Sequence, residues 1–167
     1  MSGQPTNFDF ATIVPIENGA PLVPPYSIIE LGDKLQLRSY FHCSGDDAVV
    51  RKNVKDILTG GTVTVKYFFQ DLQGTGSAIS PVTGPAIAQL TPSEIEERFK
   101  PSGDLAKSGL DQTDDYYFSD NTDDIALMPG GGGEVTGTWR VLTVLHGDSG
   151  TGDHVTAFDD SLIVQVV

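Results

Sequence analysis

The sequence predicts a mainly β fold, an antiparallel β-sandwich of about seven to nine strands with two short helical insertions. Its 167 residues suit a single domain over 1–167, within which residues 1–9 are the segment expected to be disordered. The hydrophobic residues, 38% of the chain, fall in short apolar runs between glycine and proline signals. That spacing is typical of an all-β fold rather than of a disordered chain.

The first half of the chain contains four predicted strands and one predicted helix. FATIVPI (Phe10–Ile16) and YSIIEL (Tyr26–Leu31) are extended, and the prolines around them favour positions at sheet edges. KLQLRSYF, residues 34–41, alternates apolar and polar residues as a half-buried strand does. AVVRKNVKDIL, residues 48–58, has helical spacing, whereas TVTVKYFFQDL, residues 62–72, is rich in β-branched and aromatic residues and predicts a strand.

The second half adds a second short helix and more strands. A capping box with proline at the first helical position, residues 91–94, predicts a helix start. YYF, residues 116–118, and DIALM, residues 124–128, are candidate short strands. TWRVLTVLH, residues 138–146, and SLIVQVV, residues 161–167, are the last two strands, joined by a glycine-rich hairpin loop.

The strand patterns also predict a core and a second apolar face. The predicted core consists of inward-facing apolar residues: Leu35, Leu37, Phe41, Val63, Val65, Trp139, Val141, Leu162 and Val164. Leu142 and Val144 lie on the opposite face of the strand that carries Val141 and Leu145. A strand with one solvent-exposed face carries polar residues on that face, whereas this strand is apolar on both faces. We therefore expect the second face to be covered by the helices or by another subunit.

Charge narrows the classes of partner. The formal net charge is −13, and the segment from Ser108 onward contains eleven acidic residues and a single basic residue, Arg140. Nucleic acid is therefore not an expected partner, because phosphate binding needs a basic surface. An acidic surface favours cations or a basic protein instead.

Other sequence features bear on the compartment. No apolar run reaches the roughly 18 residues of a membrane span, so no membrane partner is expected. The start MSGQPTNFDF has neither a basic nor an apolar region of the kind that a secretory signal needs. Cys43 is the single cysteine, so no intrachain disulfide can form. These observations lean toward a cytoplasmic location and leave the compartment undecided.

EVTGTWRVLTVL, residues 134–145, resembles the approach to the last two strands of immunoglobulin-like and fibronectin-type sandwiches. In that superfamily an acidic residue, a glycine and an aromatic ring precede the penultimate strand, and Glu134, Gly137 and Trp139 match them. The resemblance implies that Leu35 and Leu37 lie on the second strand and Val65 and Tyr67 on the third. It also implies a disulfide-free domain, since Val141 stands where antibody domains place a cysteine. It implies a fold and no activity.

Two short stretches resemble the active-site motifs of chymotrypsin-like serine proteases. YFHCSG contains a His-Cys pair at His42, and LHGDSGTGDH contains Gly-Asp-Ser-Gly around Ser149. Thr151 replaces the second glycine of the family motif, and Cys43 has no cysteine with which to form the usual disulfide. A nucleophilic serine also needs a base, an orienting acid and an oxyanion hole. We therefore expect no enzyme activity and no catalytic residues.

The densest acidic stretch is DQTDDYYFSDNTDD, residues 111–124. Calcium takes six to eight oxygen ligands, which clustered Asp and Asn side chains in loops can provide. The candidate metal ligands are Asp114, Asp115, Asp120, Asn121, Asp123 and Asp124, and the candidate ligand-binding rings beside them are Tyr116 and Tyr117. The alternative reading is two short strands with solvated turns. No cofactor is expected apart from this candidate calcium ion.

The function that these observations favour is a non-catalytic protein-interaction or structural module. Its partner is an unidentified protein or further copies of the chain, since no convergent catalytic set is present and apolar residues occupy both faces of one strand. The alternative is a calcium-dependent carbohydrate-binding domain that uses the acidic stretch and its tyrosines.

Overall fold

The computed structural model describes most of the chain. The described residues are 8–22, 24, 26–43, 56–57, 60–74, 78–100, 103, 115–125, 127, 136–148, 150 and 154–167. The predicted helix over 48–58 lies outside them except for Asp56 and Ile57, which are helical.

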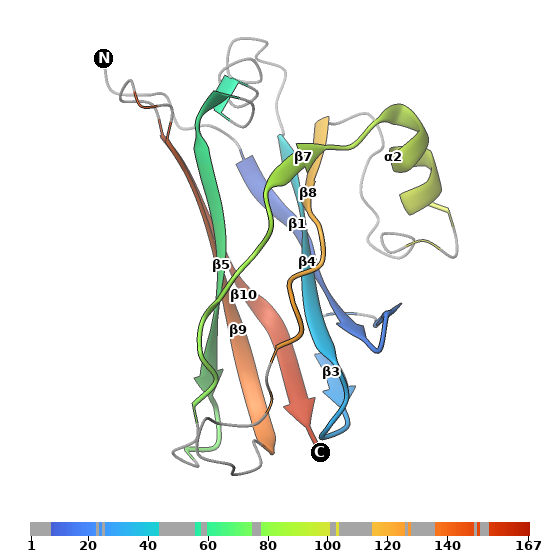
Figure 1. Ribbon diagram of the computed structural model, residues 1–167, viewed down its shortest axis with the longest axis vertical. Helices are drawn as coiled ribbons and strands as arrows, with labels where there is room; N and C mark the ends of the chain where they lie inside the picture. The colour runs from blue at the N-terminus through green and yellow to red at the C-terminus, as the bar shows by residue number, and fades with distance from the viewer. Residues whose placement is uncertain are drawn as a thin grey trace.

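The described strands form two sheets that pack face to face (Figure 1). Sheet A has the order β2-β1-β4-β8-β7, and sheet B the order β3-β10-β9-β5-β6. The strands of sheet A are β1 (Phe8–Glu17), β2 (Ala20–Pro21), β4 (Leu35–Cys43), β7 (Ile87–Gln89) and β8 (Asp115–Ser119). Those of sheet B are β3 (Tyr26–Ile29), β5 (Thr62–Asp71), β6 (Val82–Thr83), β9 (Gly137–Asp148) and β10 (His154–Val166). The predicted mainly β sandwich is therefore confirmed.

The pairing is antiparallel throughout except at one edge. β3 runs parallel to β10, with Tyr26 opposite Ile163 and Ile29 opposite Val166. Backbone hydrogen bonds continue the pairing beyond β10, where Val167 N donates to the Ile29 carbonyl and Leu31 N donates to the Val167 carbonyl. The chain reaches this position because it leaves sheet A after β2, adds β3 to the edge of sheet B, and returns to sheet A as β4.

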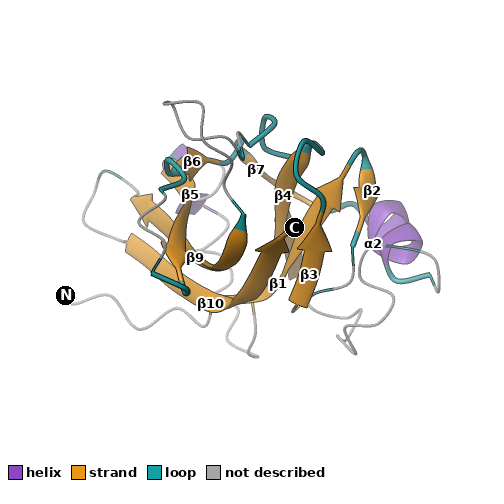
Figure 2. Ribbon diagram, turned by 90° about the horizontal axis from the view of Figure 1, so that it is seen from below, coloured by secondary structure: helices purple, strands orange, loops and turns teal. Residues whose placement is uncertain are grey.

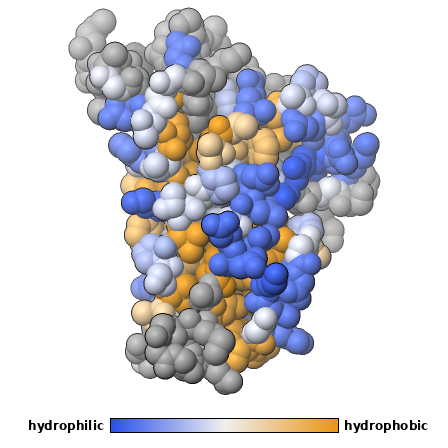
Figure 3. All heavy atoms as spheres, in the orientation of Figure 1, coloured by the Kyte–Doolittle hydropathy of each residue, from blue (hydrophilic) through white to orange (hydrophobic). Residues whose placement is uncertain are grey.

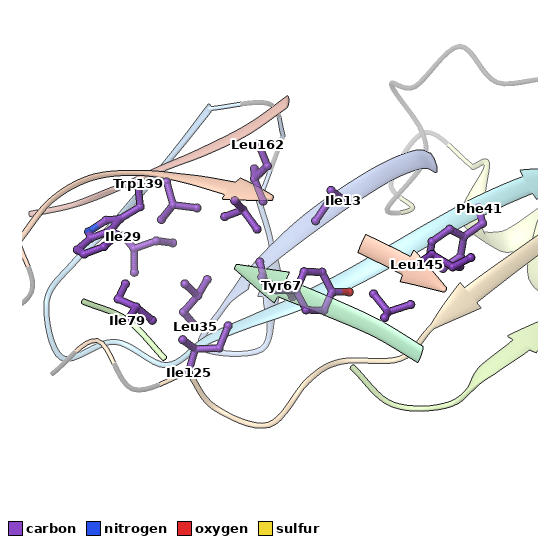
Figure 4. Close-up of a cluster of buried hydrophobic side chains, with 14 of the residues drawn as sticks. Ile13, Ile29, Leu35, Phe41, Tyr67, Ile79, Ile125, Trp139, Leu145 and Leu162 are labelled. Atoms are coloured by element: carbon purple, nitrogen blue, oxygen red, sulfur yellow. The ribbon is translucent and has the colours of Figure 1, made fainter. Parts of the chain in front are cut away.

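The core lies between the inner faces of the two sheets, and Figure 4 shows it in close-up. Eight of the nine predicted core residues are buried; Val63 is partly buried and packs against the same cluster. The prediction succeeded because period-two alternation fixes which side chains share a face, and burying that face is the main favourable term in folding.

A buried polar contact joins the two sheets inside this core. Tyr67 on β5 and Ser39 on β4 share a hydroxyl–hydroxyl hydrogen bond, and both residues are fully buried. Ser119 on β8 also hydrogen-bonds Tyr67, and its Oγ donates to the Pro85 carbonyl. The Tyr67 hydroxyl therefore reaches from sheet B across the core to two strands of sheet A.

Helix α2 (Pro92–Arg98) begins where the sequence predicts. The Thr91 side chain accepts a hydrogen bond from Glu94 N, the Glu94 carboxylate accepts one from Thr91 N, and Pro92 occupies the first turn. These bonds satisfy two backbone donors that the first turn of a helix would leave unpaired. They also lower the pKa of the Glu94 carboxyl.

Helix α2 lies on the outer face of sheet A, on the side away from sheet B (Figure 2). Ile95 and Phe99 pack there against a second apolar cluster made of Val14, Ile16, Tyr40, Leu90 and Tyr116. Phe99 meets the Tyr116 ring edge-on at 5.2 Å between centroids. α2 therefore covers the part of the outer face of sheet A formed by this cluster.

Three element boundaries differ from the predictions. β10 begins at His154 rather than near Ser161, because residues 154–159 continue the pairing with β9 before a bulge between Asp159 and Leu162. The predicted strand over 124–128 is wrong among its described residues, since Ile125 makes only an isolated bridge to Leu35. Phe8 and Asp9, in the segment expected to be disordered, open β1.

Candidate functional site

The acidic stretch runs from the start of β8 into the turn that follows it. Asp111 to Asp114, including the predicted ligand Asp114, lie outside the described residues. Asp115 is the first residue of β8, and Asp120, Asn121, Asp123 and Asp124 follow the strand at its far end. The five-residue strand therefore separates Asp115 from the other described candidates.

Basic and amide side chains of β4 and its preceding turn contact the described candidates. The Arg38 guanidinium donates to Asn121 Oδ1 at 2.7 Å and lies 3.6 Å from Asp120 Oδ1. Lys34 Nζ lies 3.5 Å from Asp124 Oδ2, and Gln36 Nε2 donates to Asp124 Oδ1 at 3.1 Å. These contacts attach the turn after β8 to β4, so several of the predicted metal ligands already have a structural role.

The described part of the chain contains no group of three or more His, Cys, Asp or Glu side chains placed to hold a metal ion. Asp123 is exposed, and its carbonyl accepts a hydrogen bond from the buried Thr122 hydroxyl. Calcium binding here stays a prediction of the sequence, and its remaining candidate ligands include residues outside the described chain.

The calcium prediction can be tested by thermal unfolding. A ligand that binds only the folded chain raises the melting temperature, because it increases the free energy of unfolding by RT ln(1 + [L]/Kd). If the site exists, millimolar calcium should raise the melting temperature by several degrees over excess EDTA. The double variant Asp120→Ala, Asp123→Ala should lose that rise. Equal melting temperatures in the two buffers would exclude the site.

The two predicted ligand-binding rings lie in the interior. Tyr116 is 0% exposed and belongs to the cluster under α2, whereas Tyr117 is 2% exposed and belongs to the core between the sheets. Successive side chains of a strand point to opposite faces, and in β8 both faces are covered. Because a sugar ring stacks only on an accessible aromatic face, their burial argues against the prediction that they bind a surface ligand.

The protease-like residues are only partly described. His42 lies on β4, where its ring is 6.0 Å from the Tyr116 ring between centroids, and its Nδ1 is buried with no hydrogen-bond partner. Ser149 lies outside the described residues. The geometry of a His42–Ser149 pair is therefore untested.

The outer face of sheet B carries a group of exposed apolar side chains. We call this surface the B face; its apolar members are the exposed Tyr26, Ile28, Phe68, Leu142 and Phe158 and the half-buried Val144 and Ile163. Phe158 is 67% exposed and Ile28 54%, which are large fractions for apolar side chains within strands. The inward neighbours in the same strands, such as Val141 and Leu145, are fully buried.

Strand register brings most apolar side chains of the B face next to one another. Phe68 on β5 pairs directly with Leu142 on β9, and Val144 pairs with Phe158 on β10. Ile163 on β10 pairs with Tyr26 on β3. Residues opposite one another in neighbouring strands lie about 5 Å apart, so Phe68, Leu142, Val144 and Phe158 form one apolar patch across β5, β9 and β10. Ile163 and Tyr26 lie beyond the bulge of β10, at a pair position where β9 carries Arg140.

Of the two predicted helices, the one that the structure describes does not cover the B face. α2 packs on the outer face of sheet A, and Figures 1 and 2 show it away from β5, β9 and β10. In Figure 3 hydrophilic residues gather on the side of α2, while apolar residues appear along the middle of the view, between the sheets. Sequence reasoning identified Leu142 and Val144 as a second apolar face. It missed Phe158, because it started the last strand too late.

Basic residues accompany the apolar ones on the B face. Lys66 pairs with Val144, and Arg140 lies between Gln70 and Ile163 in the register. The Arg140 Nε is buried and has no hydrogen-bond partner within the described structure. The B face thus combines apolar contact area with two basic side chains, Lys66 and Arg140.

Comparisons with known proteins give two distant structural similarities. The crystal structure of the C-terminal domain of Wzt has a TM-score of 0.48 and 12% identity, over 99% of this chain and 75% of that one. The CooA pilin subunit from enterotoxigenic Escherichia coli has a TM-score of 0.30 and 9% identity, over 93% of this chain and 99% of that one. No protein-family model matches the chain, and no curated protein matches its sequence.

Among the described residues, no helix is long and apolar enough to cross a membrane.

Proposed function

We propose that this chain is a non-catalytic interaction module and that the B face is its binding surface. The observation that carries the proposal is the patch of apolar side chains across β5, β9 and β10, with the exposed Tyr26 and Ile28 on the neighbouring strand β3. Contiguous exposed apolar surface is uncommon on monomeric proteins and marks sites of association. Exposed aromatic residues support this reading, since aromatic residues are enriched in binding interfaces.

The composition of the B face supports a protein partner. Large apolar side chains lie in its middle, whereas Thr62, Thr64, His146, Asp148 and Thr156 lie toward one end. Protein interfaces have the same arrangement, with an apolar centre inside a polar rim. The apolar side chains would be shielded from water on binding, and that transfer supplies most of the favourable free energy of association.

An immunoglobulin-like architecture is part of the proposal. In immunoglobulin domains one sheet has the strand order A-B-E-D, and the other brings together C, F and G. The order β1-β4-β8-β7 in sheet A and the neighbours β5, β9 and β10 in sheet B agree with this arrangement. Trp139 occupies the position of the conserved ring and is buried, although its Nε1 has no hydrogen-bond partner among the described residues. Sandwiches of this kind present strand faces and end loops to many kinds of partner.

If the B face serves binding, its apolar side chains are not required for the fold. We therefore expect Phe158→Thr to change the free energy of unfolding by less than about 1 kcal/mol, the usual worth of one cross-strand pair. Val164→Thr, on the same strand but 1% exposed, should cost about 1–3 kcal/mol because it buries a hydroxyl. Urea unfolding of both variants measures the difference.

Threonine is a good strand former, so neither substitution changes strand propensity much. A loss at Phe158 as large as the loss at Val164 would mean that the B face is covered within the folded chain. That result would contradict the proposal.

A further inference from the structure

We infer that the B face binds the B face of a second copy of this chain, giving a dimer with twofold symmetry. The inference rests on the proposed function in taking the B face as the binding surface, and it adds the identity of the partner. Three properties of the face support a second copy as its occupant: its size, its charge balance and its position as the outer face of a sheet.

The size of the B face matches what a stable dimer needs. β5 contributes ten residues, and four adjacent strands contribute the width. At about 3.3 Å per residue and about 4.8 Å between strands, such a face covers about 600 Å². Two copies would then bury about 1,200 Å² in total, which reaches the lower end of the range of about 1,200–2,000 Å² found in stable interfaces.

The charge on the B face is balanced, in contrast to the chain as a whole. Lys66 and Arg140 supply two basic groups, the exposed Asp148 supplies an acidic one, and the exposed Asp160 adds a second acidic group in the bulge of β10. The whole chain carries −13, so most approaches between two copies bring acidic surfaces together. Association through the B face avoids that repulsion.

The same balance makes the face complementary to itself. In a twofold interface the same patch meets its copy, so a residue that contacts a second residue is contacted by it in return. A patch with two groups of each sign can therefore pair its own basic groups with the acidic groups of the partner.

Packing one sheet on another is a common way to bury such a surface. Two sheets pack face to face about 10 Å apart, with their strands rotated by about 30°, and their side chains interdigitate. Sheet B already packs in this way against sheet A through its inner face. The dimer would add a second packing of the same kind on its outer face, where Leu142 lies near the centre.

The test is the mass of the full chain in solution as a function of concentration, measured by light scattering and sedimentation. The chain has a mass of 17.8 kDa, so a dimer has twice that mass. We expect the wild-type chain to approach the dimer mass within the range from about 1 μM to about 1 mM. We expect Leu142→Glu to raise the dimer dissociation constant at least about 100-fold, since the substitution buries two uncompensated charges at the interface.

Two further variants keep the test decisive. Ala88→Glu adds the same charge at an exposed position on β7 of sheet A and should leave dimerisation unchanged. Phe158→Thr weakens the B face without adding charge, so it covers the case in which Leu142→Glu fails to fold. Circular dichroism establishes that each variant is folded.

A wild-type chain that stays at 17.8 kDa up to about 1 mM overturns the inference. So does a Leu142→Glu variant that folds and dimerises as the wild type does. If the chain is monomeric while Phe158→Thr leaves its stability unchanged, the B face is free but binds a different molecule, and the proposed function survives. If Phe158→Thr unfolds the chain, the proposed function fails as well.

Discussion

Replacing Trp139 with alanine is expected to lower the free energy of unfolding by about 3–5 kcal/mol, the range observed when a large buried aromatic side chain is removed. Trp139 is 1% exposed and is among the largest fully buried side chains of the core (Figure 4). Removing it loses the transfer free energy of the indole and leaves a cavity that the two sheets can only partly close. Since single domains have stabilities of about 5–15 kcal/mol, the variant should be close to unfolding.

Urea unfolding followed by circular dichroism measures this effect, because Trp139 is the only tryptophan and its fluorescence is lost with it. Phe158→Ala is the matched control, since it removes an aromatic ring from the same sheet at a position 67% exposed. Its cost should be below about 1 kcal/mol. Trp139→Phe should cost less than Trp139→Ala, because much of the volume is kept. Equal costs for Trp139→Ala and Phe158→Ala would contradict the position of Trp139 in the core.

Replacing Tyr67 with phenylalanine is expected to lower the free energy of unfolding by about 1–3 kcal/mol at neutral pH. The substitution keeps the ring in the core but removes the hydroxyl that bonds Ser39 and Ser119 across the sheets. Ser39 is 0% exposed, so its hydroxyl would lose this partner in a place that water does not reach. A buried polar group without a partner costs its desolvation free energy, which accounts for the expected loss.

The cost of Tyr67→Phe should also depend on pH. Burial raises the pKa of the Tyr67 phenol from 10.0 to about 12, although its hydrogen bonds with Ser39 and Ser119 lower it. Between these two values the unfolded chain has lost the phenol proton and the folded chain still holds it. The folded state then binds more protons, so stability falls as pH rises from about 10 to about 12. A shift of two pKa units corresponds to a loss of about 2–3 kcal/mol.

Phenylalanine has no proton to lose, so the variant lacks this contribution. The difference in stability between wild type and Tyr67→Phe should therefore be constant from pH 7 to about pH 9 and should shrink above pH 10. Urea unfolding of both chains at several pH values measures it, and effects of other groups cancel in the difference. A difference that does not change up to pH 11 would mean that the Tyr67 phenol is not buried.

Sequence patterns predicted where strands occur in this protein better than the residues at which those strands begin and end. The alternation in residues 34–41 and the β-branched run in residues 62–72 correspond to β4 and β5. β10 was predicted too short, because its first half is separated from its second half by the polar residues Asp159 to Ser161 at a bulge. A bulge breaks the period-two pattern, so the periodicity by itself could not join the two halves of the strand.

The candidate site could be predicted only in part, for a similar reason. The sequence places Tyr116 and Tyr117 beside a cluster of acidic residues, which suggested an exposed binding loop. In the structure these tyrosines belong to β8, and the element that covers Tyr116 is a helix about twenty residues earlier in the chain. Burial by an element distant in sequence leaves no signal near the residue it covers.

The sequence by itself determined the mainly β sandwich, most of the core, the capped helix at Pro92 and the presence of a second apolar face at Leu142 and Val144. These properties depend on the order of residues within a strand or a helical turn, which local periodicity and hydrogen bonding fix. Only the tertiary structure decided that α2 covers sheet A and that Phe68, Leu142 and Phe158 form one exposed surface on sheet B. Those properties depend on which strands become neighbours and on the register between them. That choice is made by the packing of the whole chain, because each strand alone fits several partners equally well.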